Sequence, residues 1–125
     1  MNNFRRKDLK NINLEINTKI IKLLNNIFGD IDEKTKCNVI NNLKDVAEDL
    51  SFVEEEEQMA FDNMPEGLQY SFRGQEIEEN INMLNEQCYE IEYIINSLED
   101  NSIDAKKAVE ELKKVSNSIS YLILK

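Results

Sequence analysis

The sequence contains no histidine, no tryptophan, one proline and three glycines in 125 residues. Without histidine, the side chain most often used as a general base and as a metal ligand is missing. A β-sandwich or barrel needs many turns, so the scarcity of proline and glycine argues against both. The apolar fraction of 41% is enough for a core, which argues against disorder along the whole chain. The length suits a single domain over residues 1–125.

Long apolar runs are missing as well. The longest is Tyr121 to Leu124, whereas a membrane-spanning helix needs about 20 apolar residues. The first ten residues contain asparagine and charged side chains where a signal peptide would have an apolar region. We therefore expect a cytoplasmic protein that makes no membrane contact. In the cytoplasm, Cys37 and Cys88 are expected to stay reduced and to be buried as small apolar side chains.

Apolar residues recur at helical spacing over four ranges, 4–28, 31–63, 74–99 and 102–124. The third range has the most regular pattern, with alternating gaps of four and three residues between Ile77, Ile81, Leu84, Cys88, Ile91, Ile95 and Leu98. Three such heptads are typical of a coiled coil or a helical bundle. The sequence therefore predicts an all-α fold.

Short connections after the first and third helices predict antiparallel neighbours, and thus two helical hairpins. We expect them to form a four-helix bundle or a coiled coil. The second helix, at about 45 Å, would be longer than its neighbours. An overhanging apolar seam needs a partner, which favours a homodimer.

Several residues are predicted to set the helix ends. Gly29 is a natural stop for the first helix. Asp30, three residues before Glu33, has the spacing of a capping box at the start of the second helix. Asn101 or Ser102 is the expected cap of the fourth helix.

Charge is distributed unevenly along the chain. The net charge is −10, but residues 1–44 carry +4, residues 45–104 carry −17 and residues 105–125 carry +3. Ordinary solvated helices mix the two signs, because pairs four residues apart then attract. The acidic stretch could face the chain's own basic helices, or it could face a basic partner.

A basic partner would meet a surface with a charge density close to that of nucleic acid. The 16 carboxylates of residues 45–99 amount to roughly 0.4 charges per Å of helical hairpin, against about 0.6 per Å for duplex DNA. The hairpin could thus occupy a groove built for phosphates, and it could not itself bind nucleic acid through that face. The residues predicted to form this acidic face are Glu54, Glu55, Glu56, Glu76 and Glu79.

The connection between the two hairpins, about 63–73, concentrates apolar side chains and the only cation between Lys44 and Lys106. These apolar side chains could plug the open end of the bundle, with Arg73 paired to Asp62 or Glu66. Alternatively, the connection forms a rigid knob that docks into a partner, since aromatic, methionine and arginine side chains are enriched in interfaces. The candidate contact residues are Met64, Leu68, Tyr70, Phe72 and Arg73.

The run D-N-M-P-E-G-L-Q at 62–69, followed by Ser71 and Arg73, resembles a segment of small helical proteins of Gram-positive bacteria, their phages and mobile elements. The resemblance covers about 54–98 and departs from the family pattern at Gly67, which is commonly Asn there. It implies a helical hairpin and a phage or mobile-element origin, but no activity.

No pattern for catalysis, a cofactor or a metal ion is found. Nucleotide-binding glycine loops are absent, and histidine-based triads and di-iron sites are excluded. Glu57 interrupts the apolar seam of the second helix, and we expect it to lie in water because the neighbouring acids would make burial costly.

The expected function is therefore non-enzymatic. We expect an inhibitor or regulator that blocks a basic, nucleic-acid-binding surface of a host factor such as a CRISPR or restriction effector. The alternative is a structural coiled-coil adaptor or assembly protein.

Overall fold

The computed structural model describes residues 1–125 and contains helices but no strands. The four helical segments begin and end within three residues of the predicted ranges. The elements are α1 (Asn3–Glu15), η1 (Ile16–Ile21), α2 (Lys22–Asn25), α3 (Glu33–Asp62), α4 (Glu66–Gln69), α5 (Phe72–Glu99) and α6 (Ala105–Leu124).

The first helical segment contains a stretch of π-helix, η1, which the sequence pattern did not predict. The side chains of Asn17 and Thr18 donate hydrogen bonds to the carbonyls of Asn13 and Leu14, at 2.8 and 2.7 Å. Such bonds compete with the regular backbone ladder and widen or bend a helix. The segment ends at Asn25, and Gly29, with φ +93°, belongs to the following loop. The prediction that Gly29 stops the helix directly was wrong.

The cap of α3 is Asp32, not Asp30. Asp32 has an extended backbone, and its carboxylate accepts a hydrogen bond of 2.7 Å from the backbone N–H of Thr35. This bond lowers the pKa of the Asp32 carboxyl, because it favours the charged form.

The cap of α6 is likewise displaced from the prediction. Asp104 accepts from the backbone N–H of Lys107 at 2.8 Å. The predicted residues are used elsewhere: Asn101 has φ +60°, and the N–H of Ser102 donates to Asp100 and to Ser97. Both residues therefore form the turn after α5.

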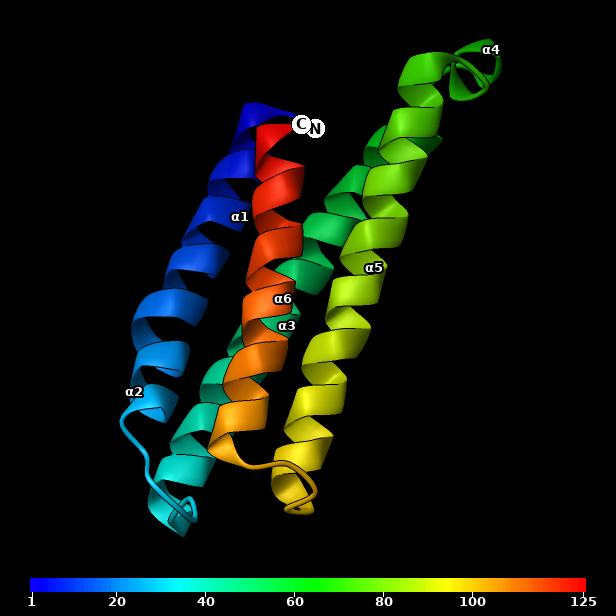
Figure 1. The fold of residues 1–125 in the computed structure, drawn as a ribbon. Helices are drawn as coiled ribbons and strands as arrows, with labels where there is room; N and C mark the ends of the chain where they lie inside the picture. The colour runs from blue at the N-terminus through cyan, green and yellow to red at the C-terminus, as the bar shows by residue number, and fades with distance from the viewer.

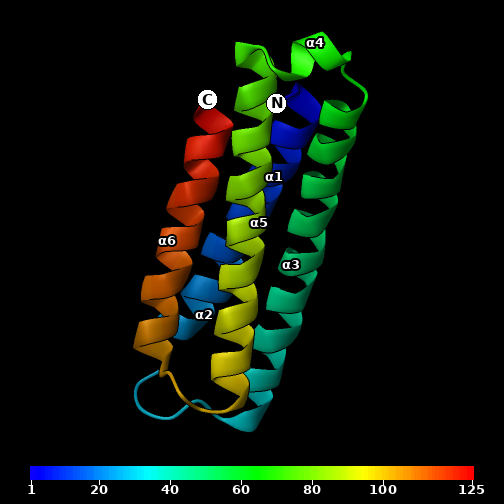
Figure 2. The ribbon, with the colours of Figure 1, turned by 90° about the vertical axis from the view of Figure 1, so that its right-hand side faces the viewer.

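The helices α3 and α5 form an antiparallel hairpin, and α1 and α6 lie beside each other along it (Figures 1 and 2). Each of α1 and α6 contacts the other and one helix of the hairpin. The predicted apolar seam of α5 supplies fully buried side chains, among them Leu84, Ile91 and Leu98. One continuous apolar core runs between the four elements.

The contact between α1 and α6 also contains polar groups. Ser116 donates to Asn13 at 2.6 Å, Asn13 donates to Ser120 at 2.9 Å, and Asn17 donates to Ser116 at 2.9 Å. These bonds depend on the relative position of the two helices, so they fix the register of α1 on α6.

The hairpin runs past the ends of the two other helices. In Figures 1 and 2, α4 and the adjoining turns of α3 and α5 project beyond the start of α1 and the end of α6. Arg5 of α1 meets Glu57 of α3, and Lys125 meets Asn80 of α5. Residues between 57 and 80 therefore form the projecting end of the hairpin. No helix is both long enough and apolar enough to cross a membrane.

Candidate partner-binding surface

Most carboxylates of the α3–α5 hairpin have no cation within ion-pair distance. Of the 16 in residues 45–99, three form ion pairs. Glu57 pairs with Arg5 at 2.5 Å, Glu79 with Lys125 at 3.8 Å, and Glu99 with Lys44 at 3.8 Å. The basic helices thus neutralise only a small part of the acidic hairpin through direct contacts.

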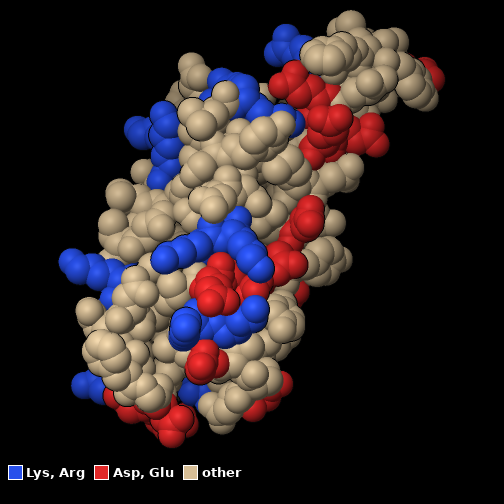
Figure 3. Space-filling model, in the orientation of Figure 1, with Lys and Arg blue, Asp and Glu red and all other residues tan.

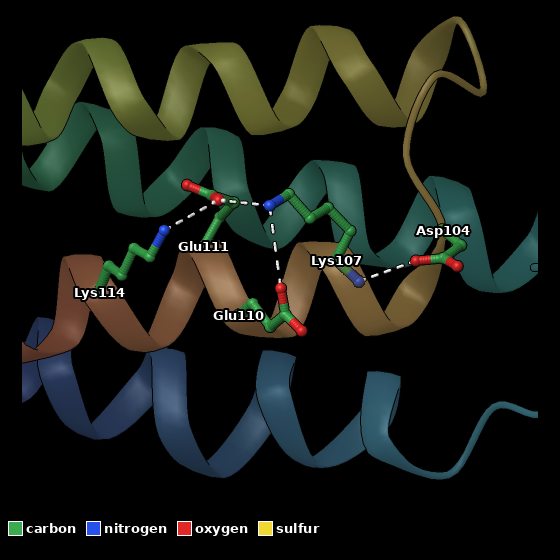
Figure 4. A network of polar contacts seen from close by, with 5 residues as sticks. All are labelled: Asp104, Lys107, Glu110, Glu111 and Lys114. Atoms are coloured by element: carbon green, nitrogen blue, oxygen red, sulfur yellow. Dashed lines mark hydrogen bonds and ion pairs between the residues drawn. The ribbon is translucent and has the colours of Figure 1, made fainter.

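Two of the four lysines of α6, Lys107 and Lys114, instead form ion pairs within α6 itself. Lys107 lies 3.3 Å from Glu111 and 3.8 Å from Glu110, and Lys114 lies 3.4 Å from Glu111 (Figure 4). The hydrogen bond from Lys107 lowers the pKa of the Glu111 carboxyl and raises the pKa of Lys107. On the face drawn in Figure 3, charges of both signs alternate over α6, whereas red atoms dominate at the projecting end.

The five glutamates predicted to form one acidic face point to different sides of the hairpin. Glu55 is exposed, and Glu54 and Glu56 are half-buried. Burial and the neighbouring Glu55 raise the pKa of the Glu54 carboxyl. Glu76 and Glu79 lie near Lys125 on the α6 side of α5. Successive helical residues differ by about 100° in direction, so a run of acids surrounds a helix instead of marking one side.

A second concentration of acids lies between α1 and α3. Asp8, Glu15 and Asp49 line a hollow of about 350 Å³ together with Phe52. Burial, and then the neighbouring carboxylates, raise the pKa of the Asp49 carboxyl. No group of three or more acidic or cysteine side chains is arranged to hold a metal ion. The hollow adds to the negative field of the hairpin.

Glu57 is fully buried, so the expectation that it lies in water was wrong. Its Oε1 accepts from Nε of Arg5, whose side chain is 13% exposed. An ion pair with good geometry can compensate for the cost of removing a carboxylate from water. The position of Glu57 in the apolar seam was the signal for burial, but no pattern in the sequence identified Arg5 as its partner.

The turn between α3 and α5 is a folded unit held by hydrogen bonds. Gln69 donates to the carbonyls of Phe61 and Met64 at 3.0 and 3.3 Å. Ser71 donates to the carbonyl of Leu68 at 2.5 Å and accepts from the N–H of Gly74 at 3.3 Å, which caps α5. These contacts make the turn a short helix, α4, with defined ends.

Gly74 is required where α4 meets α5. A Cβ atom at this position would overlap the carbonyl oxygen of Gln69, closer than any real contact. At Gly67, within α4, a Cβ would meet nothing within 4 Å. Glycine is therefore needed at position 74, where α4 and α5 approach each other closely, but not at position 67.

The apolar side chains of the turn face solvent. Leu68, Tyr70 and Phe72 are 52%, 76% and 83% exposed, and Met64 is half-buried. Arg73 is exposed and forms no ion pair with either of its predicted partners, Asp62 and Glu66. The interpretation of the turn as a plug was wrong. The hairpin extends past the start of α1 and the end of α6 (Figures 1 and 2), so the turn lies beyond the helix ends that it would have to cover.

The two cysteines are less buried than expected. Cys37 is exposed and Cys88 is half-buried, and neither forms a disulfide. Burial, with Glu54 and Glu92 nearby, raises the pKa of the Cys88 thiol to about 11. A thiol with such a pKa stays protonated at neutral pH and is a poor nucleophile.

Comparison with known proteins adds no relative to these observations. None of the known family profiles matches the sequence, and no curated protein or solved structure matches it either.

Proposed function

We propose that the protein is a non-enzymatic inhibitor or regulator that uses the acidic α3–α5 hairpin to occupy a basic, nucleic-acid-binding surface of another protein. The observation that carries the proposal is the set of hairpin carboxylates without a cation of their own. Only Glu57, Glu79 and Glu99 among the 16 are in ion pairs. The others remain available to a partner.

The mechanism is competition with phosphates. A long hairpin presents carboxylates at nearly the spacing of phosphate charges, and it does so on a rigid, packed scaffold. When a basic groove binds DNA or RNA, counterions are released into solution. Binding of this hairpin in the same groove would release counterions as well. The partner we propose is therefore a basic host effector, such as a component of a CRISPR or restriction system. The resemblance of residues 54–98 to phage and mobile-element proteins supports that setting.

The exposed turn supports a second contact. Its hydrogen bonds fix the backbone that carries Leu68, Tyr70, Phe72 and Arg73 before any partner binds, so little backbone entropy is lost on association. Preorganised aromatic side chains next to an arginine are typical of binding hot spots.

A structural adaptor is the second candidate function. The observation that favours it is the projecting end of the hairpin beyond α1 and α6 (Figures 1 and 2), where Ala60, Met64 and Ile77 continue the apolar seams. Such a seam suits assembly into a homodimer or a longer coiled coil. In that case the acidic surface would serve solubility only.

A charge-reversal experiment separates the two candidates. One variant changes Glu54, Glu55, Glu76 and Glu79 to Lys. The matched control changes Asp8, Asp30, Glu33 and Glu110 to Lys, which shifts the net charge by the same +8 outside the acidic residues 45–99. Each is used as bait in a pull-down from bacterial lysate, with duplex DNA added as competitor.

Under the proposed function, the wild-type protein and the control recover a basic partner and the hairpin variant does not. Raising salt from about 50 to about 500 mM should release the partner, because screening weakens exposed charge pairs. Equal recovery by both variants, or binding that ignores salt and DNA, would contradict the electrostatic mechanism.

A further inference from the structure

The projecting end of the hairpin contains a groove that the rest of the molecule leaves open. It encloses about 660 Å³ between the start of α1 and the inner side of the hairpin. Its apolar lining comes from Met1 and, on the hairpin, from Ala60, Met64, Leu68 and Ile77. These residues are half-buried or exposed, although three of them continue the same stripes that are fully buried further along α3 and α5. The groove is therefore a part of the core that lacks two covering helices.

The polar groups of the groove are incompletely paired. Nε of Arg6 and Oε2 of Glu57 are buried without a hydrogen-bond partner. Arg6 uses its Nη2 to donate to the carbonyl of Lys125 at 2.9 Å, and Arg73 has no anionic partner. Buried polar groups without partners are rare in folded proteins and need an explanation. Arg73 is thus a guanidinium without an ion-pair partner at the border of the groove, which Glu57 and Glu76 line as well.

The tip of the hairpin has the complementary properties. Asp62 and Glu66 are exposed acids without an ion pair, next to the exposed side chains of Leu68, Tyr70 and Phe72. A groove bordered by one unpaired arginine, Arg73, and a tip with unpaired acids occur on the same chain. Two copies related by a two-fold axis can therefore pair these opposite charges at two places at once, because the tip of each copy meets the groove of the other.

We infer that a second copy of this chain occupies the groove. The two projecting ends lie side by side in opposite directions, so that α3 and α5 of each copy replace the missing α1 and α6 of the other. The tip of one copy enters the groove of the other and brings Glu66 to the partner's Arg73. The apolar lining of each groove is then covered by the partner's Leu68, Tyr70 and Phe72.

The exposed apolar area at the tip suits an interface of this kind. A buried aromatic side chain covers about 150–250 Å², so Tyr70 and Phe72, at 76% and 83% exposure, offer together about 300 Å². A stable interface needs about 800 Å² per partner. Two side chains thus supply more than a third of that area, and the groove lining and the polar pairs add to it.

This assembly goes beyond the proposed function, because it assigns the turn to self-association in place of a contact with the basic partner. Of the predicted acidic residues, Glu76 lines the groove, whereas Glu54, Glu55 and Glu56 lie outside it. It would place two acidic hairpins in line, with their projecting ends overlapping. A basic partner would then meet a negative rod longer than one hairpin. The assembly does not depend on the identity of that partner, and it is tested with this protein alone.

The test uses two charge-reversal variants and their mixture in sedimentation velocity, from about 5 to about 500 µM. Arg73→Glu and Glu66→Arg each place like charges at both contacts of the dimer. In an equimolar mixture, one contact of the heterodimer joins the two introduced side chains, which again have opposite charges, and the other keeps the original Arg73 and Glu66. We expect the wild-type protein to dimerise, each variant alone to dimerise at least tenfold more weakly, and the mixture to recover the dimer.

Both residues are exposed and unpaired within the chain, so neither change should affect folding, and thermal unfolding followed by circular dichroism checks this. Asp30→Arg serves as the matched control, because it makes a comparable charge change at the far end of the hairpin and should dimerise as the wild type does. A wild-type protein that stays monomeric at 500 µM would overturn the inference. So would a dimer that neither variant weakens, or a mixture that associates no better than the two variants alone.

Discussion

The two ends of the α3–α5 hairpin are built from the same apolar repeat but differ in what surrounds them. The closed end is the one opposite the projecting end, where α3 begins and α5 ends, and where the other helices cover the hairpin. There, Lys36 of α3 donates to the carbonyl of Glu99 and to the side chain of Asn101, at 3.3 and 3.0 Å, and Leu98 is 2% exposed. At the projecting end, Ile77 is only half-buried and Phe72 is 83% exposed. A heptad pattern thus indicates which side of a helix can be buried, and the neighbouring helices decide whether it is.

The polar contacts at the two ends differ in a similar way. The closed end satisfies its buried lysine with neutral carbonyl and amide oxygens. Where the projecting end begins, a buried carboxylate, Glu57, depends on a single guanidinium, that of Arg5. The loss of one partner should therefore be tolerated at the closed end and not at the other.

The largest expected effect comes from Arg5→Met. It leaves the fully buried Glu57 without its cation, which should lower the free energy of unfolding by about 3–5 kcal/mol. Lys36→Met is the matched control, because the Lys36 side chain is similarly buried at 11% exposure, its hydrogen-bond partners are neutral, and its ion-pair partner Glu33, at 3.9 Å, is exposed. That change should cost about 1 kcal/mol. Urea denaturation measures both. Adding Glu57→Leu to Arg5→Met should restore most of the stability, and equal losses in the two single variants would contradict this account.

A smaller effect is expected from Gly74→Ala. The new Cβ would collide with the backbone carbonyl of Gln69, which no side-chain movement can relieve, and a loss of about 1–3 kcal/mol is expected. Unchanged stability in urea denaturation would show that the turn has no fixed packing against α5.

The same substitution at Gly67 should have the opposite sign. A Cβ there meets nothing, and alanine lowers the conformational entropy of the unfolded chain. We expect Gly67→Ala to raise the stability by about 0.4–1 kcal/mol in the same urea titration. A loss of stability would mean that Gly67 needs a conformation that only glycine can adopt.

The smallest effect concerns pH and the half-buried Glu54. The pKa of its carboxyl is raised in the folded protein, so the folded state binds this proton more tightly than the unfolded state does. The resulting stability is present below the ordinary pKa of 4.5 and is lost as the pH rises through the folded value. Glu54→Gln should therefore stabilise the protein at pH 7 by a few tenths of a kcal/mol, discounted for solvent screening, and have no such effect near pH 3.

Glu86→Gln is the control for this comparison, because Glu86 is exposed on α5 and has no ion pair. Its stability should follow that of the wild type at every pH. Thermal unfolding at a series of pH values gives the readout. A gain from Glu54→Gln that persists at pH 3 would have to come from a cause other than the raised pKa.

Much of the fold follows from periodicity, and the details of the site do not. The stripe that contains Leu84, Ile91 and Leu98 predicts a buried helical face, and these residues are buried. The caps were placed two or three residues too early, because several polar residues near each helix start can serve and only the loop geometry selects Asp32 and Asp104. The π-helical segment η1 was missed, because its side-chain bonds are local competitors of the backbone that no apolar pattern records.

The turn between α3 and α5 also has features that the sequence predicts and features that it does not. Its composition marked Tyr70, Phe72 and Arg73 as contact residues, but whether they plug the fold or face solvent depended on where α1 and α6 end. The length of a neighbouring helix is a property of another part of the chain. No reading of the turn itself could have supplied it.

The sequence by itself determined the helical class of this protein, the stripes that form its core and the concentration of negative charge in one hairpin, because these depend on residue types and their spacing. The tertiary structure alone decided that Glu57 is buried against Arg5, that Lys107 and Lys114 pair within α6, and that the end of the hairpin projects with an open groove. Each of these outcomes depends on which side chains from distant segments come within a few ångströms of one another, and spacing along one helix does not contain that information.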